Sequence, residues 1–84
     1  MSHLVGLDPG HAKCGLVLVD PEQRLVIDGV VLPPSRVISQ LKSWSKQEGL
    51  RLILLGNGTS SEQWNPALQR LASIEIVEER GTTL

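Results

Sequence analysis

The links between the first three apolar segments of this chain are too short to hold a helix. The segments span residues 3–7, 16–20 and 25–32, and they are rich in Leu, Val and Ile, which is typical of β-strands. Strands joined this closely run antiparallel, because a parallel connection needs a crossover of about a dozen residues or more. The first 32 residues therefore predict an antiparallel meander, with a turn at 21–24 and a candidate β-bulge at Asp28-Gly29.

The second of these segments is apolar on both faces. Val17 and Val19 are expected on one face, and Leu16 and Leu18 on the other. Strands that are apolar on both sides are typical of a sheet interior, so we expect this strand to be central and covered on both faces.

From residue 33 onward the pattern changes to alternating helices and strands. Pro33-Pro34 ends the third segment, Ser35 is the expected cap of a helix, and Gly49 is its expected stop. A second helix is expected to begin at 61 or at 66; Asn65-Pro66 fits the later start, with the asparagine as cap and the proline as first helical residue. The apolar side chains that these helices are expected to place in the core are Val37, Ile38, Leu41, Trp44, Trp64, Leu68, Leu71 and Ala72.

Two further strands, at 50–55 and 74–77, complete the element order β-β-β-α-β-α-β. A strand–helix–strand path of this length implies a parallel, right-handed crossover. We therefore predict a single α/β domain over residues 1–84, with a mixed five-stranded sheet whose first strand is central. The ends of the first, fourth and fifth strands would then meet at one edge of the sheet.

Charge and composition limit how the chain could bind nucleic acid. Its net charge is −1 and it has no Tyr or Phe, so it offers neither a general attraction to phosphates nor an aromatic platform for stacking bases. Binding would need local basic residues or a metal ion. The single cysteine, Cys14, fits a reducing cytoplasm and is expected to pack as a small apolar residue. No apolar run is long enough to span a membrane, and the first residues do not resemble a signal peptide.

The residues that join the first two strands carry the strongest functional signal. Asp8 follows the first strand, and Gly10 and Gly15 bracket Lys13 before the second strand. Asp-Pro-Gly is also a common turn sequence, and the tripeptide alone favours an ordinary turn. An acid at the tip of a central strand, followed by glycines that let a phosphate approach the backbone, indicates a cation site. Lys13 could neutralise a phosphate or be a solvated hairpin residue.

A second acid and a small-residue loop are expected at the same sheet edge. Glu78 and Glu79 follow the last strand, and neighbours on an extended chain point to opposite faces, so at most one would face Asp8. Two carboxylates on adjacent strand ends could hold Mg²⁺ or Mn²⁺, or the glutamates could form a solvated strand end. The loop Gly56-Asn57-Gly58-Thr59 could contact a phosphate through its amides or be an ordinary turn.

These three segments occur together, in this order, in one family. From Leu4 to Leu84 the chain resembles the YqgF/RuvX-like proteins, which are members of the RuvC-like, ribonuclease H-like superfamily. The resemblance implies a ribonuclease H-like fold and a magnesium-dependent cytoplasmic nuclease. It also implies nucleic-acid partners, either Holliday-junction DNA or a structured precursor of ribosomal RNA.

The resemblance implies roles for individual residues. Asp8 matches the first catalytic acid of the family and Glu79 the second, so these two are expected to hold the metal. Arg80 matches the arginine that follows the second acid, and residues 56–59 match a loop along which substrate backbone lies. With the hairpin included, the expected substrate contacts are Gly10, Lys13, Gly56, Asn57, Gly58, Thr59, Arg80 and Thr82.

The chain departs from the family at its carboxyl end. Family members continue past the motif that matches Thr82-Thr83 into helices, one of which carries a further catalytic aspartate, and this sequence ends at Leu84. We therefore expect a domain that lacks the C-terminal helices, with an incomplete metal site. One sheet face would then lack its covering helix, which favours self-association into a homodimer.

Two alternative functions stay open from the sequence. The first is a non-catalytic remnant of the fold that binds nucleic acid or dimerises. The second is a fragment of an actin- or acetate-kinase-type phosphotransferase, although 84 residues are too few for the two lobes with which such proteins enclose ATP.

Overall fold

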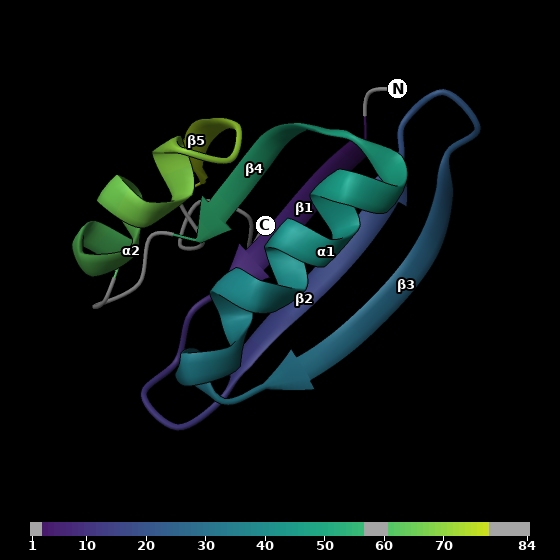
Figure 1. Ribbon diagram of the computed structural model, residues 1–84. Coiled ribbons are helices and arrows are strands. Elements are labelled where there is room, and N and C mark those ends of the chain that lie inside the picture. Colours follow the sequence, from purple (N-terminus) through teal and green to yellow (C-terminus); the bar gives the residue numbers. More distant parts are fainter. Residues whose placement is uncertain (1–2, 57–60, 78–84) are drawn as a thin grey trace, which may run out of the picture.

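The described residues, 3–56 and 61–77, form a five-stranded sheet with two α-helices on one of its faces, in a computed structural model (Figure 1). The strands are β1 (His3–Asp8), β2 (Cys14–Asp20), β3 (Leu25–Leu32), β4 (Leu50–Gly56) and β5 (Ser73–Val77). The helices are α1 (Val37–Glu48), which follows a 3₁₀ turn at Pro34–Arg36, and α2 (Ser61–Gln69). The strand order is β3-β2-β1-β4-β5, so the prediction that the first strand is central is confirmed.

The pairing directions also agree with the sequence analysis. β1 with β2 and β2 with β3 are antiparallel, whereas β1 with β4 and β4 with β5 are parallel. The register of β3 slips once, because Leu18 pairs with Asp28 and Val19 with Val26. Ile27 is therefore the extra residue of the bulge, one position before the predicted Asp28-Gly29.

The hydrophobic core lies between the helices and one face of the sheet. Alternate residues of β1, β2 and β4 point to this side, as the two-residue period of a strand requires. Ile38 of α1 and Trp64 of α2 pack at the margin of the cluster, together with Leu71 and Ala72, which follow the end of α2 and are not part of the helix as expected. The buried apolar residues are Val5, Leu7, Cys14, Leu16, Leu18, Val37, Leu41, Trp44, Ile53, Leu55 and Leu68. Burial of each Leu, Val or Ile contributes about 1.5–3 kcal/mol to folding.

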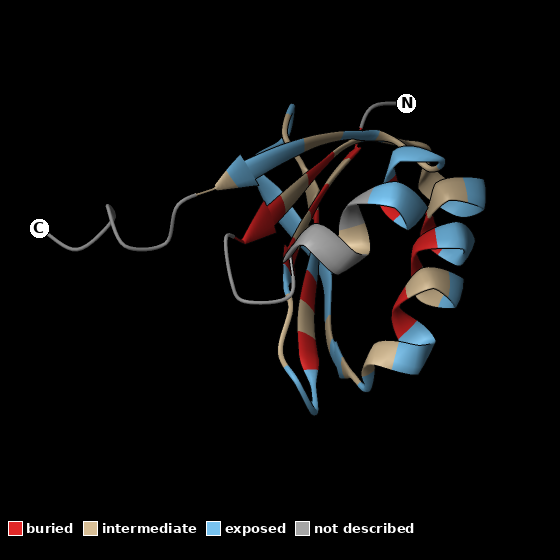
Figure 2. Ribbon diagram, turned by 90° about the vertical axis from the view of Figure 1, so that its left-hand side faces the viewer, coloured by how far each residue is buried: buried red, intermediate tan, exposed pale blue. Residues whose placement is uncertain are grey.

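The prediction that the second strand is covered on both faces is wrong for the described part of the chain. Leu16 and Leu18 are buried under the helices, but Val17, on the opposite face of β2, is 39% exposed. Both helices lie on the same side of the sheet, as the burial colours in Figure 2 show. An apolar pattern on both faces of a strand indicates a central position, but it does not require that the same chain covers both sides.

The amino-terminal end of α1 differs from the prediction, and its carboxyl-terminal end agrees with it. Ser35 does not cap the helix, because it lies inside the 3₁₀ turn, where the Arg36 amide donates to the Pro33 carbonyl at 2.9 Å. Arg36 occupies the cap position without a side-chain hydrogen bond. Gly49 ends the helix as expected, with φ of 78° and its amide donating to the Ser45 carbonyl at 3.0 Å.

The second helix has the earlier of the two starts that the sequence left open. α2 starts at Ser61, so Pro66 lies inside the helix and does not begin it. Proline has no backbone N–H, so Pro66 removes one intrahelical hydrogen bond. It is the sixth residue of the helix, close to the first four residues, whose amides have no intrahelical acceptor in any case. Trp64, which only the longer helix includes, packs against the core and favours the earlier start. Neither described helix has the length and apolar character needed to cross a lipid bilayer.

Candidate metal and nucleic-acid site

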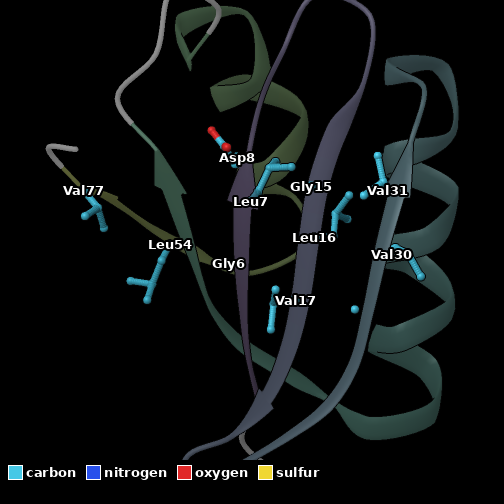
Figure 3. Close-up of a pocket in the computed structure, with 11 residues that line it drawn as sticks. Gly6, Leu7, Asp8, Gly15, Leu16, Val17, Val30, Val31, Leu54 and Val77 are labelled. Atoms are coloured by element: carbon cyan, nitrogen blue, oxygen red, sulfur yellow. The ribbon is translucent and has the colours of Figure 1, made fainter. Parts of the chain in front are cut away.

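Asp8 is the last residue of β1 and has an exposed side chain. It pairs with Gly15 of β2, and a Cβ atom at Gly15 would lie 4.0 Å from the Cβ of Asp8. The missing side chain at Gly15 therefore leaves space beside the carboxylate, which stands free at the strand end in Figure 3. An accessible carboxylate of this kind is a suitable oxygen ligand for Mg²⁺ or Mn²⁺.

The sheet register brings three strand ends to the same edge. Leu7 of β1 pairs with Leu55 of β4, which puts Asp8 level with Gly56, and Gly56 pairs with Val77 of β5. The predicted convergence is thus confirmed for Asp8 and for the ends of β4 and β5. The remaining predicted residues lie outside the described part of the chain: Asn57, Gly58, Thr59, Glu78, Glu79, Arg80 and Thr82.

The hairpin between β1 and β2 separates an exposed lysine from a buried thiol. Lys13 and His11 are exposed, whereas Cys14 is fully buried, with its Sγ 3.8 Å from the Gly10 carbonyl oxygen. Cys14 therefore packs as the predicted small apolar residue and is not placed as a nucleophile. Lys13 is exposed, and its role as a phosphate contact stays a prediction.

We expect Gly10→Ala to destabilise the protein by about 1–3 kcal/mol. A Cβ atom at Gly10 would overlap the backbone carbonyl oxygen of Lys13, so the hairpin would have to shift. Gly6→Ala is the matched control, because a Cβ atom there has no atom within 4 Å and alanine loses less entropy on folding than glycine. Urea unfolding would contradict this account if both variants lowered stability equally.

Asp8 of β1 and Glu75 of β5 both lie on the face of the sheet that the helices leave open. Among residues 3–56 and 61–77, no group of three His, Cys, Asp or Glu side chains could hold a metal ion. Asp8 fits one position of a Mg²⁺ or Mn²⁺ site, and the other expected ligand, Glu79, lies outside the described residues. Asp8 also lines a hollow of about 640 Å³ on the open face, together with Gly6, Gly15 and Gly29 (Figure 3).

This hollow was not predicted from the sequence, although three glycines in the strands indicate it. Gly6, Gly15 and Gly29 lie on three neighbouring strands and on the same face of the sheet. Glycine is uncommon inside strands and has no side chain, so three glycines on the same face of a sheet leave a shallow depression there. Only the pairing register of the strands shows that these three glycines lie on the same face of the sheet.

Comparison with known proteins identifies the fold. No model of a protein family matches the sequence, and no curated protein is significantly similar to it. Among solved structures, T. thermophilus RuvC in complex with a Holliday junction substrate matches with a TM-score of 0.71 at 12% identity. YeaZ from Pseudomonas aeruginosa matches with a TM-score of 0.57 at 18% identity, and an Aquifex aeolicus member of the Ppx/GppA family with 0.50 at 13%.

These matches cover most of this chain but only part of the other proteins. The chain is covered to 95% by RuvC and to 93% by YeaZ, whereas it spans 66% of the RuvC chain and 44% of the YeaZ chain. At such low identity the likeness concerns the fold alone. The predicted α/β, ribonuclease H-like fold is confirmed by the match to RuvC.

Proposed function

We propose that this chain is a metal-dependent nuclease domain of the YqgF/RuvX type, which acts on branched DNA or structured RNA. The observation that carries the proposal is the position of Asp8. Its exposed carboxylate ends the central strand of a RuvC-like sheet, level with the ends of β4 and β5. RuvC itself has been solved with a Holliday junction, which makes a junction the first substrate to test.

In this proposal Asp8, at the end of β1, and Glu79, in the segment that follows β5, would be ligands of Mg²⁺ or Mn²⁺, and β4 lies between these two strands. Such an ion would activate water and neutralise charge on the phosphodiester. The exposed Lys13 is placed on the hairpin next to Asp8, where it can pair with a phosphate oxygen. Arg80 is proposed to do the same, and Gly10, Thr82 and residues 56–59 are proposed to contact the substrate backbone.

The charge of the chain makes the metal necessary for this function. A net charge of −1 provides no general attraction to a polyanion, so phosphate contacts depend on the ion and a few cationic side chains. We therefore expect substrate affinity to fall together with cleavage when the metal is removed.

Metal removal is the direct test. We expect the chain to cleave a four-way DNA junction or a structured RNA in about 10 mM Mg²⁺ or Mn²⁺, and to lose cleavage in EDTA. An unbranched duplex of the same sequence serves as the matched control. Cleavage that continues in EDTA would contradict the proposal.

The non-catalytic alternative has a distinct signature in the same experiment. Retained binding of the junction with no cleavage in either metal would assign the chain to a binding module. Specific ATP binding without affinity for nucleic acid would instead favour the phosphotransferase fragment.

A further inference from the structure

The outer surface of α1 carries cationic and hydroxyl side chains. Val37, Leu41 and Trp44 of this helix are buried against the sheet, and its exposed residues lie on the opposite side (Figure 2). Residues spaced three and four apart share one face of a helix, and four exposed residues of α1 have this spacing. An exposed arginine lies three residues before the first of them. We call these five residues the cationic stripe: Arg36, Ser39, Lys42, Ser43 and Lys46.

The cationic stripe contains no acid, although the chain as a whole is slightly acidic. Residues 29–47 include the three cations of the stripe and no Asp or Glu, whereas the net charge of the chain is −1. Glu48, the nearest acid in the sequence, lies on the sheet side of α1, with its Oε1 3.6 Å from Nε2 of the buried His3. Within the described part of the chain, no carboxylate forms an ion pair with a cation of the stripe. These charges are therefore available to an external partner.

The cationic stripe begins at the edge of the sheet that holds Asp8. Cys14 pairs with Leu32, so the 3₁₀ turn that follows β3 lies beside the hairpin that carries Lys13 (Figure 1). Asp8 pairs with Gly15 at the same edge. From there α1 runs back across the sheet for 12 residues, which is about 18 Å at 1.5 Å per residue. The stripe thus leads away from the candidate metal site.

The chemistry of the stripe fits a nucleic-acid backbone. Phosphate oxygens are contacted mainly by Lys and Arg, together with hydroxyl groups, and such contacts carry no sequence information. The Ser39 hydroxyl donates to the Arg36 carbonyl at 3.1 Å, so the donors left for a phosphate are the three cations and Ser43. An amphipathic helix that binds a lipid surface inserts its apolar face, whereas the apolar face of α1 is buried in the core. Charge and burial together therefore favour a nucleic acid over a membrane.

We propose that the cationic stripe binds the phosphate backbone of a nucleic-acid arm that extends from the Asp8 edge along α1. This inference rests on the nucleic-acid substrate of the proposed function, but it does not depend on the chemistry at Asp8. Contacts remote from the reacting phosphate add affinity without a preference for sequence. Loss of the stripe should therefore weaken binding of every substrate sequence equally and leave the maximal cleavage rate unchanged.

Fluorescence anisotropy of a labelled four-way junction in EDTA, at about 20–200 mM salt, tests the proposal with Lys42→Gln/Lys46→Gln. No metal ion contributes in EDTA, so the affinity that remains comes from cationic side chains. Each phosphate contact adds about 0.9 to the slope of log K against log salt concentration, so we expect this slope to flatten by about 1.8. The Kd at about 100 mM salt is expected to rise more than about tenfold, on junctions of two unrelated sequences alike.

Arg24→Gln/Arg70→Gln is the matched control. Each double variant removes two positive charges, so both change the net charge from −1 to −3. Arg24 lies in the turn between β2 and β3 and Arg70 follows α2, and both are exposed and outside the stripe. We expect the control to raise Kd by less than about twofold. Glutamine and lysine have similar helix propensities, so circular dichroism should show that the stripe variant stays folded.

The outcomes separate this inference from the proposed function. An equal rise of Kd in both double variants would overturn the inference, as would a wild type with no measurable affinity at about 20 mM salt. Tighter binding of phosphatidylserine vesicles than of the junction through the same lysines would assign the stripe to a lipid surface and also overturn it. Junction cleavage in Mg²⁺ with unaltered affinity in Lys42→Gln/Lys46→Gln would contradict only this inference. Binding that depends on the two lysines, without cleavage in either metal, would contradict only the nuclease proposal.

Discussion

We expect Asp8→Asn to lower metal-dependent cleavage by more than about 100-fold while the protein stays folded. The change keeps the size of the side chain and removes the negative charge that would hold a divalent cation. The Asp8 side chain is exposed at a strand end, so we expect the fold to tolerate the loss of its charge. Single-turnover cleavage of a four-way junction, with circular dichroism of the same samples, measures both effects.

Asp28→Asn is the matched control for this prediction. Asp28 is also an exposed strand aspartate, but it lies on the edge strand β3, where its carboxylate accepts the Gly29 amide at 2.8 Å. Asparagine keeps an acceptor oxygen there, so we expect cleavage within about twofold of wild type. Unaltered cleavage by Asp8→Asn would refute the assigned role of Asp8, and an equal loss in both variants would point to a general effect of charge.

We expect Leu41→Ala to lower the free energy of unfolding by about 2–5 kcal/mol. Leu41 is fully buried at the middle of α1, where it packs into the single cluster that joins both helices to the sheet. A chain of 84 residues has a total stability of only about 4–13 kcal/mol, so the variant would lose a large fraction of it. The expected fall in Tm is at least about 10 °C, measured by thermal unfolding.

Lys42→Ala controls for the helix itself. Lys42 is exposed on the next position of α1, and its replacement by alanine is expected to change stability by less than about 0.5 kcal/mol. Similar melting temperatures for the two variants would mean that α1 is not held to the sheet by Leu41.

Strand order and pairing were predictable because they follow from local rules. Links shorter than a crossover made the first three strands antiparallel, and the helices expected before the fourth and fifth strands made the later pairings parallel. Helix starts were less predictable. Ser35 and Asn65-Pro66 are good capping sequences, and a cap contributes about 0.5–2 kcal/mol. Packing of an apolar side chain such as Trp64 against the core is worth at least as much, so it can move the start of a helix.

Part of the candidate site was also predictable from the sequence. Asp8 could be recognised from its position after an apolar strand and before a glycine hairpin, and the register confirms that it meets the ends of β4 and β5. Roles for Glu79, Arg80 and Thr82 stay predictions, since these residues lie outside the described part of the chain.

Hydrophobic periodicity and link length, which are properties of neighbouring residues, were enough to define the elements, their order and the central strand that carries Asp8. Which face of the sheet is buried and which is exposed depends on the tertiary structure. Val17 and Leu16 are equally apolar in sequence, yet Leu16 is buried and Val17 is exposed, because both helices pack on one side. Likewise Gly6, Gly15 and Gly29 form one hollow only because pairing over long sequence distances places them on the same face.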